Sequence, residues 1–332
     1  MREHLTDATE TRGLRSRTTP ALALVAALLA PCAAYADGER QAWEITAGFD
    51  QGYTDNVRWA ESGPQKDGAF FTTLKGELAW FNEESRYLPS EIRGGVRGRV
   101  YTKYSDRDFV EIFTNFTKDI GPNALLLRYT FIPERLRLED DPDEGAVFSR
   151  NHELSLGAER RMGPNKQLRA RLWFEGEWDI ATDGTADDRD SFLAAGVAEL
   201  RYRWHDAFVP RAGVRYGVRD ARSSNYDRDE LDVEVGFDSH PWEFLDVSFR
   251  YARLWRDYTV GSAMSSSGTN SNFDREDDAN QIELLLTIAI PRVEGLDLKL
   301  GYKLRDNQST RDSRDFDVNE GSAGLEYRFS LG

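Results

Sequence analysis

A strict period of two in hydrophobicity is the feature that most constrains the fold of this chain. The C-terminal segment alternates between two kinds of side chain: Ala323, Leu325, Tyr327, Phe329 and Leu331 against Gly324, Glu326, Arg328 and Ser330. Successive side chains of a β-strand point to opposite faces, so this pattern predicts a strand with one apolar and one polar face. The pattern recurs between Asp37 and Gly332 in about fourteen strand-length segments.

The apolar face is clearest in four further segments. Its members are Leu168, Ala170, Leu172, Phe174 and Trp178; Leu231, Val233, Val235 and Phe237; Ile282, Leu284, Leu286, Ile288 and Ile290; and Leu296, Leu298, Leu300, Tyr302 and Leu304. A soluble sandwich with one solvated face would show the same alternation. A barrel with lipid outside and a polar lumen inside would show it too.

The spacing of the predicted strands favours the membrane barrel, because short and long connections alternate. The short ones are residues 82–87, 120–123, 162–166, 205–208, 240–243 and 291–295, and the long ones are 139–150, 181–190, 220–229, 260–280 and 306–321. Outer-membrane barrels have this asymmetry, with short turns on the periplasmic side and long loops outside.

Aromatic residues near the predicted strand ends point the same way. They are Trp43, Trp80, Phe81, Tyr104, Phe109, Trp178, Tyr202, Trp204, Trp242, Trp255 and Tyr258. Rings with a polar edge suit the lipid headgroup level, so these residues are expected to form two girdles. The alternative is that they cap a soluble core.

These features together predict an all-β, transmembrane, up-and-down antiparallel β-barrel of about 14 strands, with 12 or 16 as alternatives. Every backbone group at membrane depth needs a partner within the protein, so the last strand must pair with the first, around Trp43 to Phe49. Arg253 conflicts with this pattern, because it falls on the apolar face. Either a bulge shifts the register there, or Arg253 reaches toward the outer rim.

The N-terminus is typical of a secretory signal peptide. Arg12, Arg15 and Arg17 precede an apolar run over residues 21–30, and the small-residue triplet Ala34-Tyr35-Ala36 follows it. We expect Sec export with cleavage before Asp37, which makes residues 1–36 the signal and residues 37–332 a single barrel domain in the bacterial outer membrane. Acylation of Cys32, the only cysteine, is a lipoprotein alternative that Pro31 disfavours.

The net charge excludes two classes of function. The chain carries −15, or about −16 once the signal is removed. A chain this acidic is not expected to bind nucleic acid. It also has no apolar run long enough for a membrane helix after the signal. The expected partners are outer-membrane lipid, lipopolysaccharide, the barrel assembly machinery and an anionic saccharide.

The polar face of the predicted strands is dense in charge. Its members are Arg93, Arg97, Arg99 and Lys103; Arg169, Arg171, Glu175 and Glu177; Glu199, Arg201 and Arg203; Arg211, Arg215 and Arg219; and Asp232, Glu234 and Asp238. One interpretation is a ladder of cross-strand ion pairs that stiffens the wall. The other is a selectivity surface, in which the arginines guide an anionic solute such as an acidic sugar chain. The two interpretations are compatible.

A catalytic or metal site is not expected. Catalytic barrels need a nucleophile or water activated by His with an acidic partner, and His205 and His240 fall in predicted turns. His152 alone lies near the acidic run 139–145, which could also hold Ca²⁺ but lacks the ligand pattern of an EF-hand loop. We therefore predict no enzyme activity, no cofactor and no metal.

About fourteen strands should leave a narrow lumen unless something plugs it. No globular plug is expected, because the first strand begins soon after the predicted cleavage site. The segment 260–280 contains a flexible tract of Ser, Gly, Thr and Asn, and it could fold inward.

Two segments resemble a known family. Residues 48–57, Gly-Phe-Asp-Gln-Gly-Tyr-Thr-Asp-Asn-Val, and residues 249–258, which end in Arg-Asp-Tyr, are similar to strands of outer-membrane β-barrel porins often associated with exopolysaccharide biosynthesis and export. The resemblance implies a porin-like channel for passive passage of polar or anionic solutes, with exopolysaccharide export as its specific form. The alternative is a non-conducting structural or docking barrel whose acidic extracellular loops bind a partner.

Overall fold

The structure is a computed structural model that describes residues 41–57, 67–82, 89–104, 107–137, 147–182, 190–205, 207–222, 227–258, 275–310 and 315–331. Its strands are β1 (Gln41–Thr54), β2 (Ala69–Asn82), β3 (Glu91–Tyr101), β4 (Phe109–Ile120), β5 (Asn123–Arg137), β6 (Val147–Met162), β7 (Leu168–Ala181), β8 (Ser191–Tyr202), β9 (Phe208–Ala221), β10 (Arg228–Trp242), β11 (Leu245–Tyr258), β12 (Arg275–Ala289), β13 (Leu296–Ser309) and β14 (Phe316–Leu331). The predicted signal peptide, the acidic run 139–145 and residues 260–274 lie outside the described residues.

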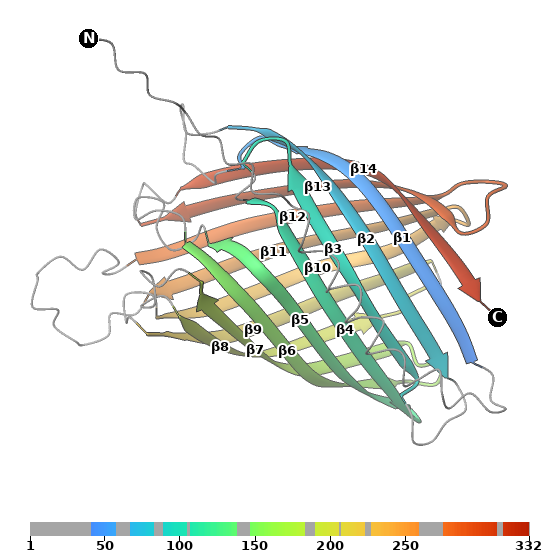
Figure 1. Ribbon diagram of the computed structural model, residues 1–332. Helices are drawn as coiled ribbons and strands as arrows, with labels where there is room; N and C mark the ends of the chain where they lie inside the picture. The colour runs from blue at the N-terminus through green and yellow to red at the C-terminus, as the bar shows by residue number, and fades with distance from the viewer. Residues whose placement is uncertain are drawn as a thin grey trace, which may run out of the picture. The chain divides into compact units, whose positions relative to one another are not determined.

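The strands form one closed antiparallel barrel in which β1 pairs with both β2 and β14 (Figure 1). Ile45 stands opposite Phe329 and Phe49 opposite Leu325 along the β1–β14 seam. Closure leaves no strand edge without a partner, as a sheet in lipid requires. The prediction of fourteen antiparallel strands is confirmed, and the alternatives of 12 strands, 16 strands and an open sandwich are wrong.

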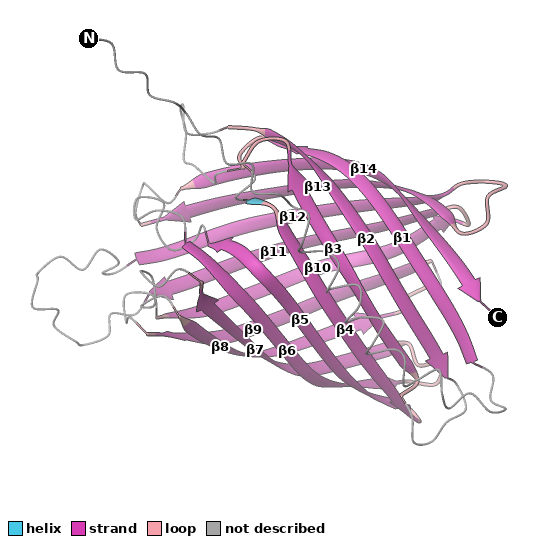
Figure 2. Cartoon of the chain, viewed as in Figure 1, coloured by secondary structure: helices cyan, strands magenta, loops and turns pink. Residues whose placement is uncertain are grey.

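Strand accounts for nearly all of the wall (Figure 2). Among the described residues, no helix is long and apolar enough to cross a membrane.

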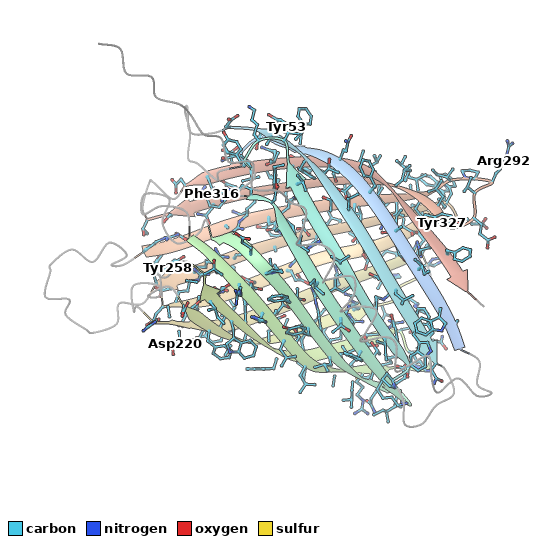
Figure 3. All side chains as sticks on the ribbon, viewed as in Figure 1. Tyr53, Asp220, Tyr258, Arg292, Phe316 and Tyr327 are labelled. Carbon is cyan, nitrogen blue, oxygen red and sulfur yellow. The ribbon has the colours of Figure 1, made fainter. Side chains whose placement is uncertain are left out.

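The outer surface of the barrel is apolar and exposed. Phe70 is 63% exposed, Leu172 66% and Phe174 56%, although all three are large hydrophobic residues in regular strands. Figure 3 shows Tyr53 and Tyr327 on the outside of the wall. Soluble proteins rarely expose contiguous apolar surface of this extent. An apolar band around a closed barrel is the surface that a transmembrane barrel presents to lipid.

The two ends of the barrel differ in their connections. We call the end that carries the turns after β2, β4, β6, β8, β10 and β12 the short rim, and the opposite end the long rim. Gly121 and Gly295 have positive φ values of 62° and 77° and permit tight turns at the short rim. Arg292 lies at this end in Figure 3, whereas Asp220, Tyr258 and Phe316 lie at the other.

All five predicted long connections overlap the observed strands, and the overlap is largest in two of them. β12 begins at Arg275, so residues 275–280 belong to the wall. β13 reaches Ser309 and β14 begins at Phe316, which leaves residues 310–315 as the connection. Near the long rim, most residues on both faces of these strands are polar. The alternation of apolar and polar residues therefore stops before the hydrogen-bonded strand does.

Three of the predicted girdle aromatics face the lumen instead of lipid. Phe81 stands opposite Glu91 and Phe109 opposite Arg99, which lie on the charged face. The hydroxyl of Tyr258 accepts a hydrogen bond from Arg228 Nη1 at 3.1 Å inside the barrel. Trp178 and Trp242 lie on the outside, at 38% and 60% exposure, as the girdle requires.

Arg253 is on the outer face, as its position in the alternation indicates. The pairing of β10 with β11 is regular from Asp229 to Ser239, so the predicted bulge at Arg253 is wrong. Arg253 Nη2 lies 2.6 Å from Asp278 Oδ2 on β12, and its guanidinium carbon lies 4.9 Å from the ring centre of Trp255. A charge-assisted bond and an aromatic face thus accommodate this cation on the apolar surface.

Candidate functional site: the charged lumen

Ion pairs between strands that are not neighbours identify the inner face of the wall. Arg99 on β3 lies 3.0 Å from Glu320 on β14, and Arg215 on β9 lies 2.9 Å from Glu175 on β7. Side chains can span intervening strands in this way only from the concave side. The alternation then assigns the more densely charged face of each strand to the lumen.

A row of arginines runs across neighbouring strands of the inner face. Arg161 on β6 stands directly opposite Arg169 on β7, and Arg169 stands opposite Arg201 on β8. Arg201 stands opposite Arg211 on β9, and Gly236 on β10 separates Arg211 from Arg250 on β11. We call these five arginines the basic row. Like charges directly opposite each other are destabilising, so stability alone does not account for their arrangement.

The basic row rises from the short rim into the barrel. Arg161 and Arg201 each precede the last residue of their strand, and Arg169 follows the first residue of β7, so all three lie at the short rim. Arg250 lies well inside β11. Strands of a barrel tilt relative to its axis, so residues paired directly across strands follow a sloping path along the wall.

Carboxylates compensate the two ends of the basic row. Arg161 Nε lies 2.8 Å from Glu159, which also receives a bond from Arg171 at 2.5 Å. Arg250 lies 2.7 Å from Glu234 and 3.5 Å from Glu283.

Compensation is weaker in the middle of the row. Arg201 pairs with Glu199 at 2.6 Å. Arg169 makes no ion pair with any described residue, and its charged neighbours include Arg161, Arg171 and Arg203 besides Glu159. Arg211 has only Asp238, at 4.0 Å, and its Nε is buried without a hydrogen-bond partner among the described residues. The middle of the row thus presents cationic groups with spare bonding capacity.

Arg219 and Arg228, nearer the long rim, are buried among carboxylates, although Arg219 Nε makes no hydrogen bond with a described residue. Arg219 lies 2.8 Å from Asp179, 3.3 Å from Glu177 and 3.5 Å from Glu230. Arg228 donates from Nε to Glu230 at 2.7 Å. We call these five residues the long-rim cluster; Arg219 is 5% exposed, Arg228 3% and Glu230 4%. The interpretation of cross-strand ion pairs applies well here.

Other predicted lumen arginines also form ion pairs. Arg93 pairs with Glu77 and Glu91, Arg97 with Glu111, Arg99 with Glu320, Arg171 with Glu159 and Glu199, and Arg215 with Glu175, Glu230 and Asp232.

Two predicted members of the charged face lie beyond the strands. Arg203 follows the end of β8 and is exposed at the short rim. Lys103 follows the end of β3 and lies 3.5 Å from Asp67. A hydrogen bond from the Tyr104 hydroxyl, together with Lys103, lowers the pKa of the Asp67 carboxyl outside the strands.

Sequence reasoning missed Arg161 and Arg250, as well as Lys303, Glu283 and Glu320 in the lumen. Arg161, Arg250, Glu283 and Lys303 lie at polar positions inside predicted strands, so the alternation alone could have found them. Glu320 falls in the predicted connection 306–321 and would have required β14 to be extended to its observed start.

His152, the histidine nearest the acidic run in sequence, lies apart from the lumen. His152 faces outward, where its Nδ1 lies 2.8 Å from the Tyr129 hydroxyl and its ring stacks on Phe131 at 4.7 Å. An Asp/His site aimed into the barrel is therefore not formed by His152. His205 and His240 lie at the short rim, and His240 bonds with Asp246. In the described part of the chain, no three His, Cys, Asp or Glu residues are grouped to hold a metal.

No protein-family model matches the chain, and no curated protein matches it in sequence. Solved structures with a similar fold include the outer-membrane channel DcaP of Acinetobacter baumannii, with 12% identity, a TM-score of 0.49, and coverage of 89% of this chain and 98% of that one. An anion-selective porin from Comamonas acidovorans has 9% identity, a TM-score of 0.48, and coverage of 88% and 100%. Pseudomonas aeruginosa OprD has 10% identity, a TM-score of 0.45, and coverage of 90% and 98%. At this level of similarity, neither the strand number nor the transport properties of those proteins transfer to this chain.

Proposed function

We propose that this protein is a porin-like channel of the bacterial outer membrane, through which polar and anionic solutes pass passively. The closed wall with its apolar outer surface supports the membrane location. The N-terminal sequence supports Sec export, and contacts with lipopolysaccharide and the barrel assembly machinery follow from that location. Passive passage requires no catalytic step.

We assign the solute selectivity of the channel to the basic row. Arg161, Arg169 and Arg201 stand directly opposite one another at the mouth of the short rim. Grouped cations in a narrow lumen with low-dielectric walls raise the local concentration of anions. Guanidinium groups also bind carboxylates and phosphates through paired donors and keep their charge at all physiological pH values. The predicted selectivity surface is thus proposed to be this row, with the remaining predicted arginines of the strands as its paired surroundings.

An acidic saccharide is the specific form of the proposal. Neighbouring strands lie about 4.8 Å apart, so from Arg161 to Arg211 the row offers a cation at intervals close to the length of one sugar ring. A chain of sugar acids could exchange carboxylates from one arginine to the next along the sloping row. Export of an exopolysaccharide would use this path, and its direction would be set by the biosynthetic machinery on the periplasmic side.

The reversal potential of the purified protein in planar lipid bilayers tests the proposal. Under a KCl gradient we expect a conducting pore that prefers chloride to potassium. Replacing Arg161, Arg169 and Arg201 together with glutamine should abolish that preference. A matched control removes one neutral pair, Arg97→Gln with Glu111→Gln, and should leave it unchanged.

Absence of current from folded, reconstituted barrels would favour the alternative, a structural or docking barrel that binds a partner through its acidic extracellular loops. A conducting pore that prefers potassium would retain the channel and refute anion guidance by the basic row.

A further inference from the structure

A cavity of about 260 Å³ opens on the inner face of the wall from β9 to β14, where the basic row ends. Its lining includes Arg211, Arg250, Lys303, Glu283, Ser248 and Ser322. The wall thus holds a concave site beside the arginines that an anion would follow from the short rim.

We propose that this cavity is a subsite for a hydroxylated carboxylate, such as a sugar acid, whose carboxylate binds to Arg211. The inference rests on the proposed function, because the solute reaches the cavity along the basic row. Beyond the proposed function, the inference names the residue that binds the solute and the chemical class of that solute.

Arg211 is the arginine of the cavity with the most spare bonding capacity. Arg250 is occupied by Glu234 at 2.7 Å and Glu283 at 3.5 Å. Arg211 reaches one carboxylate, Asp238, only at 4.0 Å, and its buried Nε has no hydrogen-bond partner among the described residues. Because Asp238 is too distant for a hydrogen bond, the terminal nitrogens of Arg211 keep donors for an incoming carboxylate, whereas the buried Nε is out of its reach.

Gly236 has no side chain and so leaves room for the Arg211 guanidinium to lie against the wall. A Cβ atom at position 236 would lie 3.1 Å from Arg211 Nε and 2.3 Å from the Phe249 carbonyl oxygen. Any larger residue would therefore displace either the guanidinium or the neighbouring strand. The space beside Arg211 depends on this glycine.

The remaining lining suits hydroxyl groups. Ser248 donates to Asp238 Oδ1 at 2.8 Å, which leaves its oxygen free to accept a hydrogen bond. Glu283 lies 3.6 Å from Lys303, so a solute hydroxyl could bond with the carboxylate and a solute oxygen with the ammonium. The volume is near the lower end of ligand pockets, which argues for one sugar ring in the site at a time.

Saturation-transfer NMR on the full-length protein in detergent tests the subsite, because it detects weak binding and needs no conductance. The probes are galacturonate, galactose and galactosamine, which differ in charge on a shared ring. We expect saturable binding of galacturonate in preference to the other two. Arg211→Gln should weaken it roughly tenfold to a hundredfold, the value of a hydrogen bond to a charged group.

Two further variants separate the subsite from general charge effects. Arg97→Gln removes one inward arginine from another part of the wall and should leave galacturonate binding unchanged. Leu285→Trp fills the cavity without changing charge and should abolish binding. It also keeps the test available should Arg211→Gln not fold, as judged by circular dichroism.

Equal binding of galactose, tighter binding of galactosamine, equal loss in Arg97→Gln, or no binding of galacturonate would each overturn the subsite. The reversal potential is measured separately, so a chloride-selective pore without galacturonate binding would refute the subsite and leave the proposed channel intact.

Discussion

Arginine serves opposite purposes at two levels of the same lumen. In the long-rim cluster, Arg219 has carboxylates of Asp179, Glu177 and Glu230 within 3.5 Å and is 5% exposed. In the basic row, Arg169 stands between Arg161 and Arg201. The residue type and the inward orientation are the same, and Arg219 also stands opposite an arginine, Arg228. The difference is the number of carboxylates within reach, which decides whether a lumen arginine stabilises the wall or remains available to a solute.

The long-rim cluster should be the more sensitive region for stability. Glu230→Gln removes the carboxylate that accepts from Arg228 at 2.7 Å and from Arg215 at 3.0 Å. Breaking a buried ion pair typically costs about 3–5 kcal/mol, because a charge is left uncompensated. Urea unfolding in lipid vesicles measures the free energy of unfolding.

Glu111→Gln is the control for Glu230→Gln. Its partner Arg97 has a side chain that is 47% exposed, so the loss should be within about 1 kcal/mol. Equal losses of unfolding free energy in the two variants would mean that burial does not make the ion pairs of the long-rim cluster more important for stability.

Gly236→Ala should disturb the basic row through sterics. The added Cβ would meet the Phe249 carbonyl oxygen at 2.3 Å, and such overpacking typically costs about 1–3 kcal/mol. The anion preference should fall as Arg211 is displaced. Gly196→Ala is the control, because a Cβ there meets nothing within 4 Å. An unchanged free energy of unfolding in Gly236→Ala would contradict the predicted clash, because it would mean that the backbone moves to accommodate the added methyl group.

Arg169→Glu should stabilise the barrel while impairing selectivity. The new carboxylate would stand opposite Arg161 and Arg201, and opposite-charge pairs across strands contribute about 0.2–1 kcal/mol each. Unfolding in urea should shift to higher concentration, while the chloride preference falls. A destabilised variant would contradict the claim that repulsion is present in the row.

Salt should separate the two regions without mutation. Raising KCl from 0.1 to 1 M shortens the Debye length from about 10 to about 3 Å, so the partly exposed basic row is screened. We expect the chloride preference to decline toward unity, while the effect of Glu230→Gln on stability changes little. A chloride preference that does not vary with salt would point to a steric origin.

The sequence alone was sufficient to predict a closed barrel and its strand number, because a period of two records which face meets lipid. It predicted the inward orientation of Arg169 and Arg201 for the same reason. It could not predict that they stand opposite each other, since register depends on the lengths of β7 and β8 and of the connection between them.

The errors have a common physical origin at the rims. Outside the hydrocarbon layer both faces of a strand meet water, so polarity no longer reports orientation. The pattern therefore predicts residues 275–280 of β12 as loop and Phe109 on the lipid side, and both predictions are wrong. It also predicts Arg203 on a strand that in fact ends at Tyr202.

The permeability ratio of chloride to potassium, measured in planar bilayers at 0.1 M KCl, tests the central claim most directly. The basic row predicts a ratio above one for the native protein and a lower ratio for Arg169→Glu, with the barrel at least as stable as before. A native ratio at or below one, or a ratio unaffected by Arg169→Glu, would contradict it.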